Sequence, residues 1–348
     1  MLRRSPLDDR HRALGAKMGE FGGWEMPISY AGTVSEHTAV RERAGLFDVS
    51  HLGKLIVRGD GVAAFLDTQL TNRMTDLAEG RARYTLICDE DGGIVDDLIV
   101  YATGPGERLL VPNAANADEV EQRLRKAAPA GISVERLDWT TLAVQGPASV
   151  EVLPEAKDLG YMRVTTAGGR VVARSGYTGE VGFEVFTPAE DAGAAWDVLL
   201  QAVEQRGGAP CGLAARDTLR LEMGYPLHGN DIDRATRPSE AGLGWAVKLD
   251  GRTFAGSDAL REPARRALVG LRMLDRLIPR RDQDVMRDGR AIGRVTSGTF
   301  SPTLKAGIAL ASVEPNEVAS GDEVAIDVRG KTGRAVVVRP PFVDRSPK

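Results

Sequence analysis

Cysteine and histidine are scarce in this chain of 348 residues. The two cysteines, Cys88 and Cys211, lie far apart, and no two of the four histidines have the spacing of a helical metal-binding pair. These absences exclude a disulfide framework and the common zinc motifs, and they favour a reducing cytoplasm. The longest apolar runs have the length of strands, so we expect no transmembrane helix.

Signatures of nucleotide binding and of serine catalysis are also missing. Gly330-Lys331-Thr332 resembles the end of a phosphate-binding loop, but Ala325 stands where that motif requires glycine. No G-x-S-x-G elbow is present. The formal net charge of −4 argues against a general nucleic-acid binder. Two arginines near the N-terminus precede no apolar run, so no secretory signal is indicated, and we expect neither nucleic acid nor a membrane as a partner.

What the sequence does contain predicts a mixed α and β protein of two or three packed units. The chain is too long for one compact core, and its 40 glycines indicate many turns and much β structure. Helices are expected over 117–128, where Asn116 and Glu119 have the spacing of a capping box, and over 189–206. Short apolar runs predict strands at Lys54–Val57, Ile94–Tyr101, Arg108–Pro112, Leu142–Gln145 and Gly182–Phe186.

The C-terminal part of the chain differs in character. From Leu268 onward, short β-rich runs alternate with turn residues, and no long helical pattern intervenes. The runs Gly293–Val295, Val324–Val328 and Ala335–Val338 predict a small antiparallel barrel or sandwich. We place the boundary before it near residues 250–265.

The stretch from Asp89 to Tyr101 combines carboxylates with an apolar strand. Its Asp-Gly-Gly turn launches a strand whose side chains alternate between two faces. One face carries Asp97, Ile99 and Tyr101, and the other carries Asp96, Leu98 and Val100. Adjacent carboxylates in such a strand are costly unless each has a partner or solvent, so the pair is a candidate functional group. Both also fit an ordinary interpretation as turn or strand-edge residues.

Six segments in a fixed order carry a more specific signal. They are Phe-Asp-Val-Ser-His-Leu at 47–52, the strand at 92–101, Ala-Val-Gln-Gly-Pro at 143–147, Gly-Tyr-Thr-Gly-Glu at 176–180, Cys-Gly-Leu-Ala-Ala-Arg-Asp-Thr-Leu-Arg-Leu-Glu at 211–222, and Thr-Ser-Gly-Thr-Phe-Ser-Pro-Thr at 296–303. Together they make the chain, from about Pro6 to Phe342, resemble the aminomethyltransferase family, and within it the T-protein branch of the glycine cleavage system.

The resemblance implies an α+β fold of three domains, arranged as a cloverleaf around a central folate cavity, with a small antiparallel β-barrel at the C-terminus. Residues 1–255 then form the folate-binding region, made of two intertwined domains (roughly 1–50 with 138–255, and 51–137). Residues 265–345 form the barrel. We expect the enzyme to be cytoplasmic, as its cysteine content indicates, and to be a monomer.

The reaction implied by the resemblance transfers an aminomethyl carbon to tetrahydrofolate. The carbon arrives on the lipoyl arm of H-protein, a transient partner, and the products are ammonia, reduced lipoyl H-protein and 5,10-methylenetetrahydrofolate. On this reading tetrahydrofolate is a co-substrate, and no metal is required. The sequence offers no group of its own that carries an aminomethyl group covalently.

Family positions transfer to this chain residue by residue. The catalytic aspartate of the family falls on Asp97, which then orients and activates the folate amine and stabilises an iminium-like state. The folate-contacting positions fall on Tyr84, Ile99, Tyr101, Asn113, Tyr177, Glu184, Arg216 and Tyr225. A carboxylate such as Glu184 is able to accept two parallel hydrogen bonds from a pterin. Structural alternatives remain for some of these side chains: the tyrosines also fit packing roles, Glu184 an exposed strand position, and Arg216 a surface helix position or a partner that holds Glu184 in place.

Some features separate this chain from its relatives or leave other functions open. Ala214 replaces a glycine and Leu52 a methionine, which changes the fit but removes no reactive group. Related proteins fuse this fold to flavin oxidases or demethylate other compounds, but no flavin fingerprint is present here. Others bind folate without catalysis and carry a cysteine motif where this chain has Ser-Gly-Tyr-Thr-Gly-Glu at 175–180. A candidate basic docking cluster for H-protein comprises Arg280, Arg281, Arg287, Arg290 and Arg294.

Overall fold

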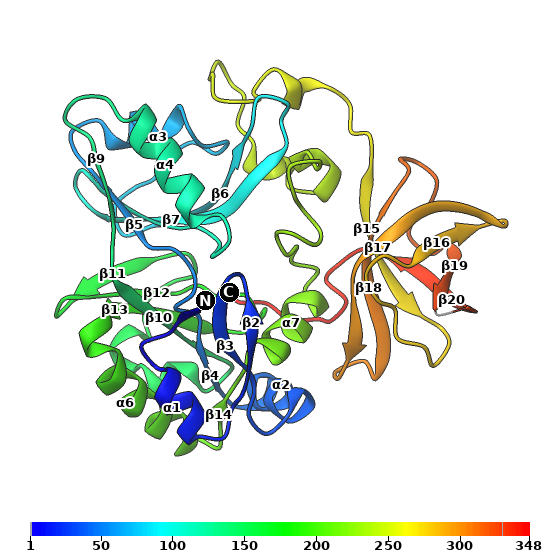
Figure 1. Ribbon diagram of the computed structural model, residues 1–348, viewed down its shortest axis with the longest axis horizontal. Coiled ribbons are helices and arrows are strands. Elements are labelled where there is room, and N and C mark those ends of the chain that lie inside the picture. Colours follow the sequence, from blue (N-terminus) through cyan, green and yellow to red (C-terminus); the bar gives the residue numbers. More distant parts are fainter. Residues whose placement is uncertain (1, 329) are drawn as a thin grey trace.

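A computed structural model describes residues 2–328 and 330–348. Two sheet-based units lie one above the other, and a separate barrel lies beside them (Figure 1). The fold is therefore mixed α and β with a closed C-terminal barrel of six antiparallel strands, as predicted. No helix in the part of the chain that the structure describes has the length and apolarity needed to span a membrane.

The first unit is built on a six-stranded sheet with the order β11-β12-β13-β10-β4-β14. Its strands are β4 (Gly45–Asp48), β10 (Trp139–Gln145), β11 (Val164–Ala167), β12 (Arg170–Ala173), β13 (Gly182–Pro188) and β14 (Ala209–Pro210). A small sheet of β1 (Arg3–Arg4), β2 (Lys17–Phe21) and β3 (Trp24–Ser29) lies in the same unit. The helices are α1 (Asp8–Ala13), α2 (Thr33–Glu42), α5 (Ser149–Val152), α6 (Ala192–Glu204) and α7 (Leu213–Glu222), with short 3-10 turns at Pro154–Ala156 and Ala189–Asp191.

The second unit is a five-stranded antiparallel sheet with the order β6-β7-β8-β5-β9. Its strands are β5 (Leu55–Arg58), β6 (Ala82–Cys88), β7 (Ile94–Gly104), β8 (Glu107–Val111) and β9 (Ser133–Arg136). Helices α3 (Val62–Asp67) and α4 (Ala117–Ala127) cover one face, where Leu66 and Leu124 are fully buried. Because the two helices cover this face, only the side chains on the other face of the sheet are able to pack against the first unit.

The two sheets pack against each other through that second face. Tyr101 of β7 and Phe186 of β13 belong to one hydrophobic cluster, and their rings lie 5.4 Å apart with edge-to-face geometry. Val171 of β12 and Leu109 of β8 extend the contact. A cavity opens beside this cluster, and Tyr101 belongs to the cluster and also lines the cavity.

The barrel consists of β15 (Ala267–Met273), β16 (Asp284–Arg287), β17 (Arg290–Ser301), β18 (Ala306–Val313), β19 (Glu323–Val328) and β20 (Lys331–Val338). Leu221 of α7 packs on Ile308 and Leu310 of β18, which attaches the barrel to the first unit. The domain boundaries given by the sequence stay a proposal, which this grouping of the strands supports.

A long segment between α7 and the barrel runs along β6, the edge strand of the second sheet, and contacts the start of β7 (Figure 1, yellow-green). It contains only the 3-10 turns Pro238–Ala241, Gly244–Ala246 and Ala259–Arg261. The amide of Ile94 donates to the carbonyls of Asp233 and Thr236, both at 3.1 Å. Gly93 allows this approach, because a Cβ there would lie 1.9 Å from the carbonyl oxygen of Arg234.

The two predicted helices form, although one was explained wrongly. Residues 189–191 make a 3-10 turn before α6 begins at Ala192, and α4 begins directly after Asn116. Asn116 makes no side-chain capping bond; its amide donates instead to Asp96 Oδ1 at 2.7 Å. The capping-box interpretation was therefore wrong, because the Asn116 side chain is oriented to donate to a buried carboxylate and its oxygen accepts no bond from the first helical amides.

Candidate functional site

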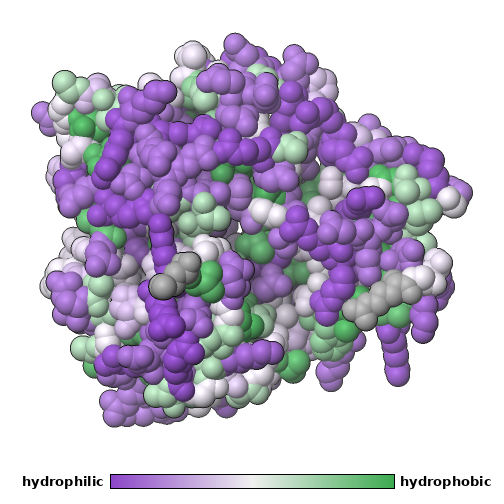
Figure 2. Space-filling view, viewed as in Figure 1, coloured by the Kyte–Doolittle hydropathy of each residue, from purple (hydrophilic) through white to green (hydrophobic). Residues whose placement is uncertain are grey.

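One cavity of about 500 Å³ lies where the two sheets and the segment 225–245 meet. Its volume is in the range of pockets that bind small molecules. Figure 2 shows hydrophobic residues gathered in the hollow near the middle of this face, inside a mostly hydrophilic surface. None of the described residues of the barrel lines the cavity. The nine residues that the sequence selected all line it: Tyr84, Asp97, Ile99, Tyr101, Asn113, Tyr177, Glu184, Arg216 and Tyr225.

Strand β7 supplies the centre of the cavity wall. Asp97, Ile99 and Tyr101 face the cavity, whereas Val100 lies in the core beneath helices α3 and α4. The strand register inferred from side-chain alternation therefore agrees with the structure. Cross-strand pairing of Tyr84 on β6 with Ile99 brings the tyrosine to the same wall.

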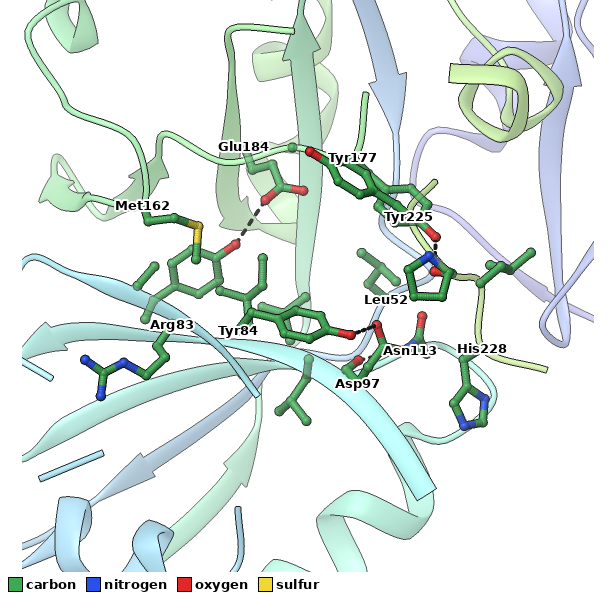
Figure 3. A pocket seen from close by; sticks show the side chains of 18 of the residues that line it. Leu52, Arg83, Tyr84, Asp97, Asn113, Met162, Tyr177, Glu184, Tyr225 and His228 are labelled. Atoms are coloured by element: carbon green, nitrogen blue, oxygen red, sulfur yellow. Dashed lines mark hydrogen bonds between the residues drawn. The ribbon is translucent and has the colours of Figure 1, made fainter. Parts of the chain in front are cut away.

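Asp97 is held by two side chains and keeps part of its surface in the cavity. Its Oδ2 accepts a 3.0 Å hydrogen bond from the hydroxyl of Tyr84, and its Oδ1 accepts one of 2.9 Å from Asn113 Nδ2 (Figure 3). Burial raises the pKa of Asp97, while nearby His228 and these hydrogen bonds act in the opposite direction. The result is a fixed carboxylate in a water-poor site.

Asp96 points the other way and is fully buried. It accepts bonds from the backbone N–H of Asn113 at 3.0 Å, from Asn113 Nδ2 at 2.8 Å and from Asn116 Nδ2 at 2.7 Å. Burial, followed by the charge of Asp97, raises the pKa of Asp96 well above its ordinary value. Asp96 is thus a structural partner, linked to Asp97 through the shared amide of Asn113.

Glu184 lies on β13, on the other side of the cavity from β7 (Figure 3). Only 6% of its surface is exposed. Its Oε2 accepts hydrogen bonds from Tyr101, at 3.0 Å, and from the hydroxyl of Ser175. Among the described residues, no donor contacts Oε1. One carboxylate oxygen is therefore anchored by the protein, while the other remains open to a ligand.

Arg216 and two tyrosines complete this side of the cavity. The guanidinium lies 4.7 Å from the centroid of the Tyr177 ring, and that ring stacks on Tyr225 at 5.7 Å (Figure 3 shows both rings). Arg216 Nη1 is buried and finds no hydrogen-bond acceptor among residues 2–328 and 330–348. A buried guanidinium donor without an acceptor is costly, which points to a ligand oxygen or nitrogen at this position. No hydrogen bond joins Arg216 to Glu184 within the described chain, so Arg216 does not serve to hold that carboxylate.

Sequence reasoning missed several lining residues, chiefly His51, His228 and Trp245. Trp245 is 59% exposed and stacks on Tyr84 with a centroid distance of 5.4 Å, so an aromatic pair edges the cavity. His51 is almost fully buried against Phe21, and burial lowers its pKa to about 3. Histidines without a metal-binding spacing gave no signal in the sequence, and an isolated tryptophan in an irregular segment gave none either.

The proposed basic docking cluster on the barrel is largely neutralised. Arg287 pairs with Asp322 at 3.0 Å, and Arg294 pairs with Asp284 at 3.1 Å. Arg290 contacts both Glu314 and Glu317. Since these charges are locally paired, the structure gives no support to this cluster as a strong attractant for an acidic partner. No group of three or more metal-binding side chains occurs in the described ranges.

Comparisons with known proteins agree over the whole chain. The GCVT N-terminal domain family matches residues 7–251, and the glycine cleavage T-protein C-terminal barrel domain family matches residues 266–344. The chain is 53% identical to the aminomethyltransferase of Parafrankia sp. (strain EAN1pec), covering 100% of this chain and 99% of that protein. It is 50% identical to the aminomethyltransferase of Mycobacterium avium (strain 104), covering 98% and 97% respectively.

A solved structure shares the complete fold. The crystal structure of glycine cleavage system aminomethyltransferase T from Bartonella henselae superposes with a TM-score of 0.95 at 36% sequence identity. The match covers 99% of each chain, so it includes both sheets, the connecting segment and the barrel.

Proposed function

Because this chain belongs to the glycine cleavage T-protein family of aminomethyltransferases, which are tetrahydrofolate-dependent one-carbon transferases, we propose that the cavity binds tetrahydrofolate and that Asp97 drives transfer of the aminomethyl carbon to it. Membership also makes the chain an enzyme, which sets aside the non-enzymatic folate-binding protein as an alternative.

The groups that line the cavity fit a folate. A pterin is a flat ring with adjacent N–H donors and a ring carbonyl. Glu184 Oε1 offers the acceptor for those donors, and the unpaired Nη1 of Arg216 offers a donor for the carbonyl. Tyr177 and Tyr225 present aromatic faces next to Arg216. Tyr84 and Trp245 form a second stacked pair, which presents aromatic faces at the edge of the cavity. Aromatic faces of this kind bind planar rings.

Asp97 supplies the charge that the reaction needs. Positive charge develops on the transferring carbon as its C–N bond breaks and ammonia leaves, and the lipoyl sulfur departs as a thiol when the second folate nitrogen bonds to that carbon. In the first of these bond-forming steps the folate amine loses a proton as it bonds to carbon. The Asp97 carboxylate orients that amine and stabilises the positive charge in a site from which most water is excluded. Tyr84 and Asn113 hold the carboxylate in place while it does so.

The donor in this proposal is the lipoyl arm of H-protein. The two cysteines cannot carry the aminomethyl group, because both are buried, and burial raises the pKa of Cys88 to about 12. The carbon therefore enters on a partner whose flexible arm reaches the cavity. A transient complex suffices for such a reaction.

The observation that carries the proposal is that Asp97 and Glu184 lie on opposite walls of one cavity. Glu184 Oε1 and Arg216 Nη1 also have no hydrogen-bond partner among the described residues. The test is a turnover assay with tetrahydrofolate and aminomethylated H-protein, in which ammonia and 5,10-methylenetetrahydrofolate are both measured. Equal release of the two products supports the proposal. Activity with a methylated amine but none with H-protein would replace it with a different one-carbon donor.

A further inference from the structure

His228 lies at the end of a hydrogen-bonded chain that leads to Asp97. Its Nδ1 is 3.1 Å from Nδ2 of Asn116, and that same amide nitrogen is 2.7 Å from Oδ1 of Asp96. Asn113 Nδ2 then bridges Asp96 Oδ1, at 2.8 Å, and Asp97 Oδ1, at 2.9 Å. Two asparagines therefore connect the imidazole to the carboxylate in the cavity. His228 itself also lines the cavity, as Figure 3 shows.

The neighbours of His228 define its tautomer. The carbonyl oxygen of Ile94 lies 3.3 Å from Nε2, and a carbonyl only accepts, so Nε2 carries the proton. Nδ1 is then an acceptor, and it receives one of the two amide hydrogens of Asn116 while Asp96 receives the other. A proton on Nδ1 would face an amide donor, and Asn116 would have to turn its oxygen toward the ring. That turn removes a donor from the buried carboxylate of Asp96.

We propose that His228 is a positioning residue for the transfer reaction: its unprotonated Nδ1 fixes the amide of Asn116, which orders Asp96 and, through Asn113, the cavity-facing carboxylate of Asp97. This inference rests on the proposed function, because it concerns the same carboxylate. It assigns a role to a side chain that lies outside the motif at 92–101 in the sequence and contacts that segment at the backbone carbonyl of Ile94.

The charged and titratable groups around the hydrogen-bonded chain from His228 to Asp97 come from four parts of the structure. Strand β7 contributes Asp96 and Asp97, and β6 contributes Tyr84, which is bonded to Asp97. On the segment that carries His228, Asp231 is paired with Arg220 and the side chain of Asp233 is bonded to Ala235 and Thr236. On α4, Glu119 is paired with Arg123 and Arg234. The other carboxylates therefore have partners of their own, and the imidazole affects the orientation of Asp96 and Asp97.

The tautomer is a direct test that does not depend on turnover. Nitrogen-15 NMR of the labelled protein at neutral pH, with the His228 signal assigned by its loss in His228→Asn, should show protonated Nε2 and unprotonated Nδ1. A protonated Nδ1 in the folded enzyme would overturn the proposal, because Asn116 could not then donate to it.

A matched set of variants tests whether the hydrogen-bonded chain from His228 to Asp97 affects the reaction. In His228→Asn, the side-chain oxygen stands near the position of Nδ1 and accepts from Asn116, whereas His228→Leu offers no acceptor. We expect His228→Leu and Asn116→Ala each to lower kcat about tenfold, the size of one lost hydrogen bond, while His228→Asn stays within about threefold of wild type. The KM for tetrahydrofolate should change little in all three, and only Asn116→Ala should clearly lower the thermal stability, because buried Asp96 loses a donor.

The double variant His228→Leu/Asn116→Ala shows whether the two side chains act on kcat through one hydrogen-bonded chain or independently. If His228 acts through Asn116, the double variant is no slower than Asn116→Ala alone. Multiplied losses would overturn the proposal, as would equal losses in His228→Asn and His228→Leu, or kcat values within twofold of wild type throughout. A wild-type enzyme that is inactive with tetrahydrofolate and H-protein contradicts the proposed function instead, and the NMR result still reports on the tautomer.

Discussion

The hydroxyl of Tyr84 donates a 3.0 Å hydrogen bond to Oδ2 of Asp97. This bond stabilises the ionised carboxylate, and it opposes the effect of burial, which raises the pKa of Asp97. The same ring stacks on Trp245 at the edge of the cavity. Tyr84 therefore contacts both the proposed catalytic carboxylate, through its hydroxyl, and the aromatic edge of the cavity, through its ring.

The first prediction concerns the acid side of the pH–rate profile. Asp97 acts as a carboxylate, so activity should fall as the pH drops through its raised pKa. Tyr84→Phe removes a hydrogen bond to the ionised form, which raises that pKa further, so the acid limb of kcat should move to higher pH. Tyr225→Phe, whose hydroxyl makes no bond to Asp97, should leave the position of the limb unchanged. An acid limb that stays fixed in Tyr84→Phe would show that Asp97 does not set it.

The second prediction concerns pterin binding by Glu184. Glu184→Gln keeps the shape but can place an N–H donor against the pterin donors or against Tyr101 and Ser175. We expect a loss of about 2–4 kcal/mol in the binding free energy of tetrahydrofolate, because groups are left unpaired in a desolvated site. Calorimetric titration measures it, with the exposed Glu190→Gln as the control. An unchanged affinity in Glu184→Gln would remove Glu184 from the site.

The third prediction uses the exposed indole of Trp245. A folate that stacks in the cavity should cover this ring, which is 59% exposed, and so change its fluorescence. Trp245→Phe should lose the signal, and Trp245→Ala should weaken binding by about 1 kcal/mol through the lost aromatic contact. If the fluorescence change persists in Trp245→Phe, it arises from one of the other tryptophans and the assigned contact is wrong.

The fourth prediction concerns the attachment of the barrel. Glu222 at the end of α7 accepts bonds from Arg41 at 2.8 Å, Ser301 at 2.5 Å and Thr303 at 2.9 Å. Burial raises its pKa, but the bonds from His37 and Ser301 and the charges of His37 and Arg41 prevail and lower it to about 2. A depressed folded-state pKa gives stability that is present above the ordinary carboxyl pKa and is lost as the pH falls toward about 2.

Glu222→Gln should therefore lower the unfolding free energy by about 3 kcal/mol at neutral pH and flatten the loss of stability in acid. Thermal denaturation at several pH values measures both effects. The control is Glu317→Gln, at a partly exposed pair with Arg290 on the barrel, which should cost less than about 1 kcal/mol. Equal melting temperatures for Glu222→Gln and wild type would contradict the role of Glu222.

The sequence predicted the parts of the site that depend on local patterns or on family motifs. Alternation along β7 placed Asp97 and Tyr101 on one face, because a strand in a packed sheet leaves its side chains no other choice. The positions of Tyr84, Glu184 and Arg216 followed from the resemblance, and the structure brings all three to the same cavity.

The parts that were missed depend on contacts between distant segments. His228 and Trp245 lie between α7 and the barrel, where the structure has only short 3-10 turns that give no periodic pattern. Their place is set by the backbone bonds from Ile94 to this segment, which require the absence of a side chain at Gly93. Asn116 was read as a helix cap for the same reason, since its partner Asp96 is 20 residues away in the sequence.

The central claim is that the carboxylate of Asp97 drives the transfer of carbon to tetrahydrofolate. The most direct measurement compares kcat of wild type, Asp97→Asn and Asp96→Asn with tetrahydrofolate and aminomethylated H-protein, alongside calorimetric affinity for the folate. Asp97→Asn should lower kcat by about 10²–10⁴ with folate affinity largely retained. Asp96→Asn should act mainly on stability and lower kcat by no more than about tenfold, through its hydrogen-bonded link to Asp97. If folded, folate-binding Asp97→Asn turns over as fast as wild type, the account of this site is wrong.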